Sequence, residues 1–147
     1  MRALIQRVLE ASVTVDGCVT GQIGKGLVVF LGVGRSDGRL EAERVAEKVA
    51  QLRVFSDEGG RMNLSVEDVG GELLIVSQFT LYGNAKKGNR PSYSEAANPE
   101  VARELYEYFI GVCQGRGLRV GTGTFQARMQ VHLINDGPVT IMYDSES

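Results

Sequence analysis

The chain has few of the residues that form metal and redox sites. It contains one histidine, His132, and two cysteines, Cys18 and Cys113, which lie far apart with no CxxC pair. This pattern predicts neither a disulfide framework nor a Cys/His zinc site. No stretch approaches the roughly 18–20 consecutive apolar residues that span a bilayer, and the first residues lack the apolar region and cleavage site of a signal peptide. We therefore expect a cytoplasmic protein with no metal and no membrane partner.

An excess of positive charge is also missing. The formal net charge is −2 and the isoelectric point is near 5.5. Tight, sequence-independent binding to long nucleic acid relies on many phosphate contacts, so this balance argues against it, and we expect no DNA partner. A local basic patch that holds one end of an RNA is compatible with the same charge.

The composition is that of an ordinary globular domain. The 147 residues are 43% apolar and 23% charged, which is typical of one domain that spans residues 1–147 and encloses a proper core. Nineteen glycines indicate many tight turns, or places where the backbone closely approaches a ligand.

Apolar runs and turn residues predict an α/β fold. We predict strands over residues 4–8, 12–15, 18–23, 27–31, 54–55, 72–81, 118–120, 129–134 and 139–143, and helices over 39–52 and 98–114. The glycine-rich segment 32–38 follows a strand and precedes a helix. Its G-x-G-x-x-x-G spacing does not match a dinucleotide-binding fingerprint, so we interpret it as a loop.

Polar residues end the strongest predicted strand. The apolar residues 73–76 are followed by Ser77, Gln78, Phe79 and Thr80. A buried hydroxyl or amide without a partner costs about 1–3 kcal/mol, so these groups require partners or a ligand. Ligand sites often lie at strand ends in sheets with helical crossovers. The sequence therefore indicates a candidate site at this strand end.

A long irregular segment follows, over residues 82–98. It carries Lys86, Lys87 and Arg90. A loop of this length within one domain is usually functional or mobile. A solvated loop is the more common explanation for its charges.

The second candidate segment is Asn135-Asp136-Gly137-Pro138-Val139-Thr140, between two apolar runs. We predict a tight turn that reverses the chain and forms a hairpin. The Gly-Pro step can hold a cis peptide, which would leave two backbone carbonyls pointing the same way. His132 lies nearby, but no serine or cysteine accompanies it at a recognisable spacing, so we assign it no catalytic role.

Together these segments resemble the D-aminoacyl-tRNA deacylases, also called D-tyrosyl-tRNA deacylases. Ser77-Gln78-Phe79-Thr80-Leu81 and the Asn135-to-Thr140 segment are similar to the two signature motifs of that family. The similarity begins at Ala3-Leu4-Ile5-Gln6-Arg7-Val8, continues through Met62-Asn63-Leu64, and reaches the last strand. It covers nearly the whole chain in the right order.

The resemblance implies one α/β domain with β/β/α layers, built from mixed sheets and two main helices. It also implies a homodimer with sites at the subunit interface, where a cis Gly137–Pro138 step enters the partner's site. The implied activity is chiral proofreading of aminoacyl-tRNA: hydrolysis of the ester that joins a D-amino acid, or glycine, to the terminal adenosine. L-Aminoacyl-tRNA is rejected, and no cofactor is implied.

The resemblance also assigns roles to individual residues. On base rates alone Arg7 is a solvent-facing strand residue, whereas the resemblance makes it a support of the Gly-Pro turn. Catalytic roles fall on Thr80, Ser77, Gln78 and Phe79, substrate binding on Gly137, Pro138, Asn135, Met129 and Phe125, and tRNA contact on Lys86, Lys87 and Arg90. In the implied mechanism the terminal ribose 2′-hydroxyl assists the attack of water, while backbone N–H groups near Phe79 and Thr80 bind the oxyanion.

Two alternatives stay open from the sequence. One is a non-catalytic RNA-binding dimer that keeps the fold. The other is a hydrolase of small D-amino acid esters in which Thr80 is the nucleophile, although the sequence offers no base at a telling spacing.

Overall fold

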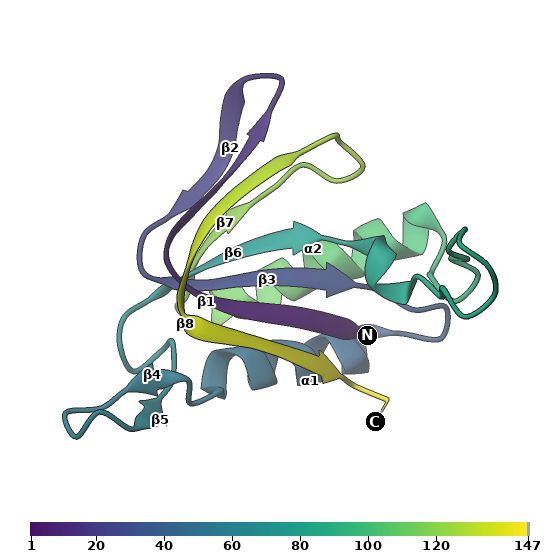
Figure 1. The fold of residues 1–147 in the computed structure, drawn as a ribbon. Coiled ribbons are helices and arrows are strands. Elements are labelled where there is room, and N and C mark those ends of the chain that lie inside the picture. Colours follow the sequence, from purple (N-terminus) through teal and green to yellow (C-terminus); the bar gives the residue numbers. More distant parts are fainter. Residues whose placement is uncertain (147) are drawn as a thin grey trace.

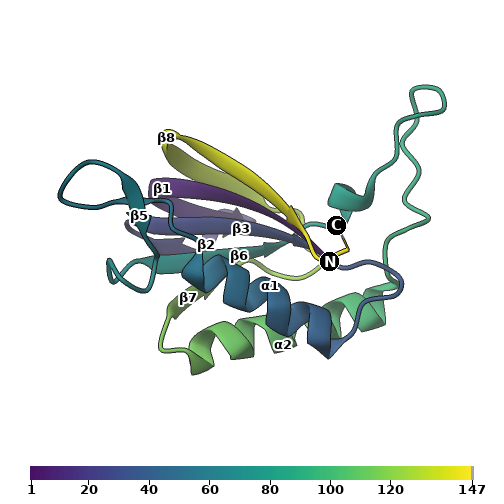
Figure 2. The ribbon, with the colours of Figure 1, turned by 90° about the horizontal axis from the view of Figure 1, so that it is seen from below.

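Six strands form one strongly twisted sheet, and two helices cover one of its faces (Figures 1 and 2). The computed structural model describes residues 1–146. In chain order the elements are β1 (Arg2–Val15), β2 (Cys18–Ile23), β3 (Gly26–Gly32), α1 (Arg39–Gln51), β4 (Phe55–Ser56), β5 (Met62–Leu64), β6 (Glu72–Ser77), the 3₁₀ helix η1 (Phe79–Tyr82), α2 (Pro99–Gly115), β7 (Arg119–Thr122) and β8 (Gln130–Asp144). The short strands β4 and β5 form a separate hairpin.

The sheet is mixed, with the order β2-β1-β3-β6-β7, and β8 pairs with the free side of β1. Strand β1 runs antiparallel to β2, β3 and β8, whereas β3, β6 and β7 are parallel to one another. Parallel neighbours need a crossover connection, and α1 and α2 lie within the connections that follow β3 and β6. The predicted single α/β domain with a mixed sheet and two helices is therefore confirmed.

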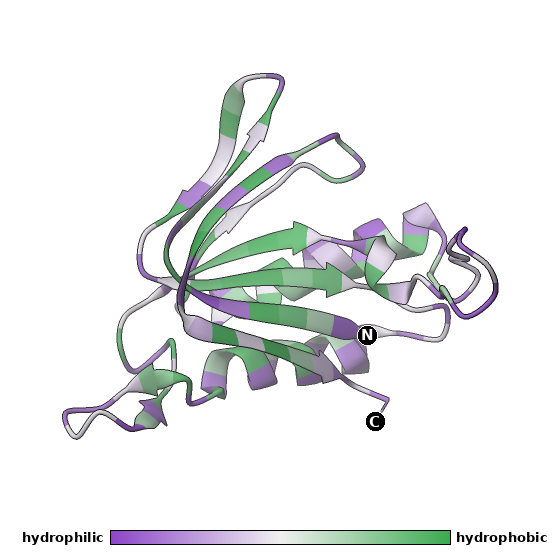
Figure 3. Cartoon of the chain, viewed as in Figure 1, coloured by the Kyte–Doolittle hydropathy of each residue, from purple (hydrophilic) through white to green (hydrophobic). Residues whose placement is uncertain are grey.

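The main core lies between the sheet and the two helices. It is filled by alternate residues of β1, β3 and β6, including Ile5, Val29 and Ile75, and by Phe109 of α2. A second cluster lies on the other face, where Val13, Val28, Leu74 and the half-buried Met129 pack together. Figure 3 shows the consequence of burial on both faces, since the inner residues of β3 and β6, 27–31 and 73–76, are all apolar.

Several local predictions agree with the structure. Strand β2 has the predicted bounds, and residues 16 and 17 form the predicted turn with φ angles of 49° and 78°. The segment 33–38 forms neither a helix nor a strand, as expected for a loop, and its one β-bridge joins Gly34 to Ala96. Helix α2 begins after Asn98, whose side chain accepts a hydrogen bond from the amide of Val101. The two strands predicted over 4–8 and 12–15 are one continuous strand, β1.

The predicted hairpin at residues 135–138 is wrong. Residues 130–144 form one strand, β8, which keeps its direction and pairs with β1 at both ends. Gln6 pairs with Thr140 and Val8 pairs with Asn135, so the intervening residues of β8 have no counterparts and bulge out of the ladder. The Gly-Pro segment is thus an enlarged bulge, and the chain does not reverse.

The strand predicted over 72–81 is also too long. Strand β6 ends at Ser77, and Phe79 begins the 3₁₀ helix η1. The last ladder contact is the amide of Gln78, which donates to the carbonyl of Leu31 (2.8 Å). The polar residues of the candidate site therefore lie at a change of backbone direction. Across residues 1–146, neither helix has the length and apolar character to cross a membrane.

A close backbone contact at the start of β3 generates a prediction. A β-carbon on Gly26 would lie 1.9 Å from the backbone oxygen of Glu72, whereas one on Gly24 would meet only the Glu72 side chain, at 3.6 Å. We expect Gly26→Ala to lower the free energy of unfolding by about 2–3 kcal/mol, because the β3–β6 ladder must shift. Gly24→Ala is the matched control and should change it by less than about 0.5 kcal/mol. Urea denaturation measures both, and equal effects would contradict the packing described here.

Candidate active site

A cavity of about 660 Å³ opens at the carboxyl end of β6. Its volume is in the range of small-molecule sites. Four stretches of chain supply its walls, and the lining residues are Val33, Val76, Ser77, Gln78, Phe79, Tyr93, Ala96, Ala97, Pro99, Ala102, Phe125, Gln126, Ala127, Met129 and Val131. The cavity therefore lies at the end of a buried strand, next to the residues that the sequence indicated as a candidate site.

Backbone hydrogen bonds fix the outer wall of the cavity. The amide of Ala97 donates to the carbonyl of Val33 (2.9 Å), and the amide of Arg35 donates to the carbonyl of Glu95 (3.1 Å). These bonds tie the loop after β3 to the segment before α2. The wall is consequently held by backbone and does not depend on long side chains.

The floor is held by α2. The buried hydroxyl of Tyr106 donates to the carbonyl of Ile75, at 3.0 Å, two residues before Ser77. Burial, with a smaller contribution from Glu107, raises the pKa of Tyr106 to about 12, so the phenol stays protonated and keeps donating at neutral pH. The end of β6 is thereby anchored to the helix.

The segment from Ser77 to Thr80 presents its polar groups at the cavity edge. Ser77 and Gln78 are half-buried and line the cavity, while Thr80 is exposed on η1 and is not among the lining residues. The Gln78 side-chain amide donates to Thr80 Oγ1. The first amides of a helix have no carbonyl acceptor within it, so the amides of Phe79 and Thr80, at the start of η1, are suited to bind an external oxygen.

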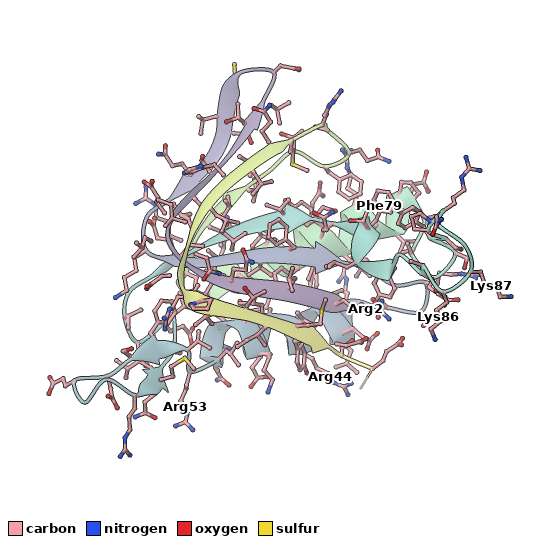
Figure 4. All side chains as sticks on the ribbon, in the orientation of Figure 1. Arg2, Arg44, Arg53, Phe79, Lys86 and Lys87 are labelled. Atoms are coloured by element: carbon pink, nitrogen blue, oxygen red, sulfur yellow. The ribbon has the colours of Figure 1, made fainter. Side chains whose placement is uncertain are left out.

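Two aromatic rings stand at the mouth. Phe79 is 55% exposed, and its ring meets that of Tyr93 edge to face, with centroids 5.0 Å apart. Figure 4 shows Phe79 at the end of β6. The mouth is therefore apolar beside the polar strand end.

The Gly-Pro segment forms an exposed bulge on β8, and its Gly137–Pro138 peptide is cis. Asn135 holds the bulge from within: its Oδ1 accepts from the amide of Val139 (3.1 Å), and its Nδ2 donates to the Val139 carbonyl (3.0 Å). Asn135 is thus bound to its own loop and does not line the cavity.

Arg7 holds the same bulge from β1. Its Nε donates to the Asp136 carbonyl (2.8 Å), and its Nη1 donates to the Val54 carbonyl. Its side chain is only 13% exposed and lies 3.4 Å from the Asp136 carboxylate. The interpretation of Arg7 as a solvent-facing residue is wrong.

One chain does not bring its two motifs together. The bulge lies level with Arg7, which pairs with Leu27, and Leu27 pairs with Leu73, four residues before Ser77. Strands β1 and β3 intervene between β8 and β6. Standard strand spacing then separates the bulge from the cavity by roughly 20 Å. Of the predicted substrate-binding residues, the structure places Phe125 and Met129 at the cavity, and Gly137, Pro138 and Asn135 elsewhere.

The other predicted residues lie at the surface. Lys86, Lys87 and Arg90 are exposed on the loop that follows η1 and do not line the cavity. His132 is exposed on β8, 3.8 Å from Glu10. Within residues 1–146, no cluster of three or more His, Cys, Asp or Glu side chains is arranged to hold a metal ion.

Sequence reasoning missed the small residues of the wall. Ala96, Ala97 and Ala102 surround the Asn98–Pro99 helix start and leave the space that the cavity occupies. The only sequence signal near them was the Asn98–Pro99 capping pattern. This pattern located the start of a helix but did not show which face of that helix packs against the sheet.

Comparison with known proteins gives the family. A family model described as D-Tyr-tRNA(Tyr) deacylase matches residues 4–144. A D-aminoacyl-tRNA deacylase of Koribacter versatilis (strain Ellin345) is 60% identical over 146 residues, covering 99% of this chain and 98% of that protein. The corresponding protein of Anaeromyxobacter dehalogenans (strain 2CP-C) is 59% identical over 145 residues, covering 99% and 97%.

Two solved structures share the fold. One, described as "c-Myc DNA Unwinding Element Binding Protein", has a TM-score of 0.92 at 42% identity and covers 98% of each chain. The other, a probable eukaryotic D-amino acid tRNA deacylase, has a TM-score of 0.86 at 18% identity and covers 97% of each chain.

Fold and cavity together define an α/β protein with a strand-end cavity whose volume suits a small ligand or the end of a larger one. The chain belongs to the D-Tyr-tRNA(Tyr) deacylase family. The enzyme class predicted from the sequence, a hydrolase of the D-aminoacyl-tRNA deacylase type, is confirmed by this membership.

The contacts of Arg7 generate a prediction. Arg7→Lys removes the planar donor group that reaches two carbonyls at once. Since hydrogen bonds from charged groups contribute about 1.5–3 kcal/mol, we expect this substitution to lower the free energy of unfolding by about 2 kcal/mol. Arg35→Lys is the matched control, because the exposed Arg35 side chain makes a long hydrogen bond, 3.4 Å, to one carbonyl, that of Ser94. Equal unfolding curves for the two variants would show that Arg7 does not hold the bulge.

Proposed function

We propose that this protein hydrolyses the ester bond between a D-amino acid and the terminal adenosine of tRNA, releasing the free D-amino acid and the tRNA. The observation that carries this proposal is the family match over residues 4–144, which includes both signature segments. The strand-end cavity supports it with a suitable volume. We expect the enzyme to act in the cytoplasm as a chiral proofreader of aminoacyl-tRNA.

The chemical step uses water and a backbone oxyanion site. Water attacks the ester carbonyl carbon, and the amides of Phe79 and Thr80 bind the negatively charged oxygen of the tetrahedral intermediate. The bond between this carbon and the ribose oxygen then breaks, and the ribose oxygen takes up the proton that the water has lost. Ser77 and Gln78 orient the carbonyl or the water. His132, the only histidine in the sequence, lies outside the cavity. As the family resemblance implies, the neighbouring ribose 2′-hydroxyl assists proton transfer.

Selection between the two hands requires a second copy of the chain. Gly137 and Pro138 are exposed and far from their own cavity, and we propose that they enter the cavity of the partner in a homodimer with β/β/α layers. Their carbonyls accept from the α-ammonium and fix its direction. An L side chain then collides with the Gly-Pro backbone, whereas a D side chain points into open space and glycine has none, so glycyl-tRNA is also a substrate.

Lys86, Lys87 and Arg90 contact the RNA in this proposal. They lie on the exposed loop that leaves η1 and that also carries Tyr93, a cavity residue, and lysine and arginine commonly donate hydrogen bonds to phosphate.

Purified protein incubated with D-tyrosyl-tRNA and L-tyrosyl-tRNA tests the proposal. We expect release of D-tyrosine at least about 100-fold faster than release of L-tyrosine, because a steric wall rejects more firmly than a missing contact. Thr80→Ala should retain deacylation within about tenfold, and a terminal 2′-deoxyadenosine should abolish most of it, as expected for general-acid–base assistance.

Each other outcome selects an alternative. Equal D and L rates contradict the selector, and tRNA binding without turnover indicates the RNA-binding dimer. Loss of activity in Thr80→Ala with a normal rate on the 2′-deoxy substrate indicates a threonine nucleophile.

A further inference from the structure

A row of cations lies along the outer side of α1, away from the candidate active site. It lines a hollow of about 470 Å³, which we call the α1 hollow, formed by Arg44, Glu47, Lys48, Gln51, Leu52, Arg53 and Tyr143. None of these residues lines the cavity at the end of β6. The α1 hollow is therefore a separate feature of the surface.

The lining of the α1 hollow carries three cations and one acid, in a chain whose net charge is −2. Within the part of the chain that the structure describes, Arg44, Lys48 and Arg53 form no ion pair. Arg53 Nη1 donates to Asn63 Oδ1, at 3.3 Å, and Lys48 Nζ lies 5.4 Å from the Tyr143 ring. Two guanidinium groups and an ammonium around one hollow suit an anion with several oxygens, such as phosphate.

Helix stability explains only part of this pattern. Lys48 lies in the last turn of α1, where a positive charge stabilises the negative end of the helix. Arg53 directly follows the C-cap Leu52 and can share this effect, whereas Arg44 lies a turn before Lys48 and is farther from that end. All three nevertheless line the same hollow.

The α1 hollow begins beside the Gly-Pro bulge of the same chain. Arg53 precedes Val54, whose carbonyl accepts from Arg7, and Arg7 also donates to the carbonyl of Asp136, the residue before Gly137. Figure 4 shows Arg44 below α1 and β8 and Arg53 by the β4–β5 hairpin, both along the lower edge of the molecule, whereas Lys86 and Lys87 lie at its right-hand end.

We propose that the α1 hollow binds backbone phosphates at the acceptor end of the tRNA whose terminal adenosine occupies the partner's cavity. This proposal rests on the proposed function. If the bulge enters the partner's cavity, surfaces beside the bulge face the RNA that leaves that cavity. The tRNA is then held by the α1 hollow of one chain and by the Lys86–Lys87 loop of the other.

Three substitutions that remove the charge test this assignment. The variant Arg44→Gln/Lys48→Gln/Arg53→Gln is compared with Arg39→Gln/Arg61→Gln/Arg119→Gln, which removes the same charge from exposed positions outside the α1 hollow. Fluorescence anisotropy measures binding of an acceptor-stem RNA hairpin that carries no amino acid. Phosphate contacts release counterions, so we expect the first variant to bind the hairpin at least about tenfold more weakly. The slope of log Kd against log salt concentration should fall by the amount that corresponds to about two phosphate contacts. The control should change Kd less than about twofold.

Kinetics supply a second readout. The first variant should raise KM for D-tyrosyl-tRNA and leave kcat unchanged, and it should hydrolyse D-tyrosyl-adenosine like the unmodified protein, because that substrate lacks the phosphates. Unchanged RNA affinity, or equal weakening by the control, overturns the proposal. Loss of inorganic phosphate binding in the first variant, with its RNA affinity unchanged, assigns the α1 hollow to a free anion and also overturns the proposal. Binding of RNA that carries no amino acid does not require hydrolysis. A failure of the α1 hollow proposal can therefore be distinguished from a failure of the proposed hydrolysis.

Discussion

Two strands stand between the Gly137–Pro138 bulge and the cavity in every copy of the chain, and that spacing is fixed by backbone hydrogen bonds. The ladders from β8 through β1 and β3 to β6 leave no freedom for the bulge to reach Ser77 on its own chain. A small shift of a loop cannot close a separation of roughly 20 Å across a hydrogen-bonded sheet. The proposed site therefore depends on two chains, and so does the assignment of the α1 hollow.

The bulge has a form that suits recognition by backbone. It offers an exposed glycine and proline, and its shape is held from both sides by Asn135 and by Arg7. A surface whose side chains are this small can present carbonyl oxygens without contacting a substrate side chain. The Gly-Pro bulge of the proposed site can consequently distinguish D- from L-amino acids without recognising the identity of the side chain.

Sequence patterns predicted most of the fold because local signals agreed with tertiary packing. The Asp16–Gly17 turn fixed β2, and the Asn98 cap fixed the start of α2. The hairpin at residues 135–138 was wrong because Gly-Pro turn statistics ignore β1, which is long enough to pair with β8 on both sides of the bulge. Ser77, its neighbours, Phe125 and Met129 were predicted as site residues and line the cavity, whereas Ala97 and Ala102 were missed because they carry no chemical signal in a sequence.

Activity of mixed dimers tests the two-chain site most directly. Ala97→Trp fills the cavity of one chain, and Pro138→Trp blocks the bulge of another; each variant alone should be inactive on D-tyrosyl-tRNA. When equal amounts of the two variants are refolded together, half of the two-fold dimers contain one chain of each variant. Such a mixed dimer has one intact site, formed by the open cavity of one chain and the unblocked bulge of the other. The mixture should therefore recover about one quarter of the unmodified activity. No recovery in verified mixed dimers would contradict the account and place both motifs of a working site on one chain.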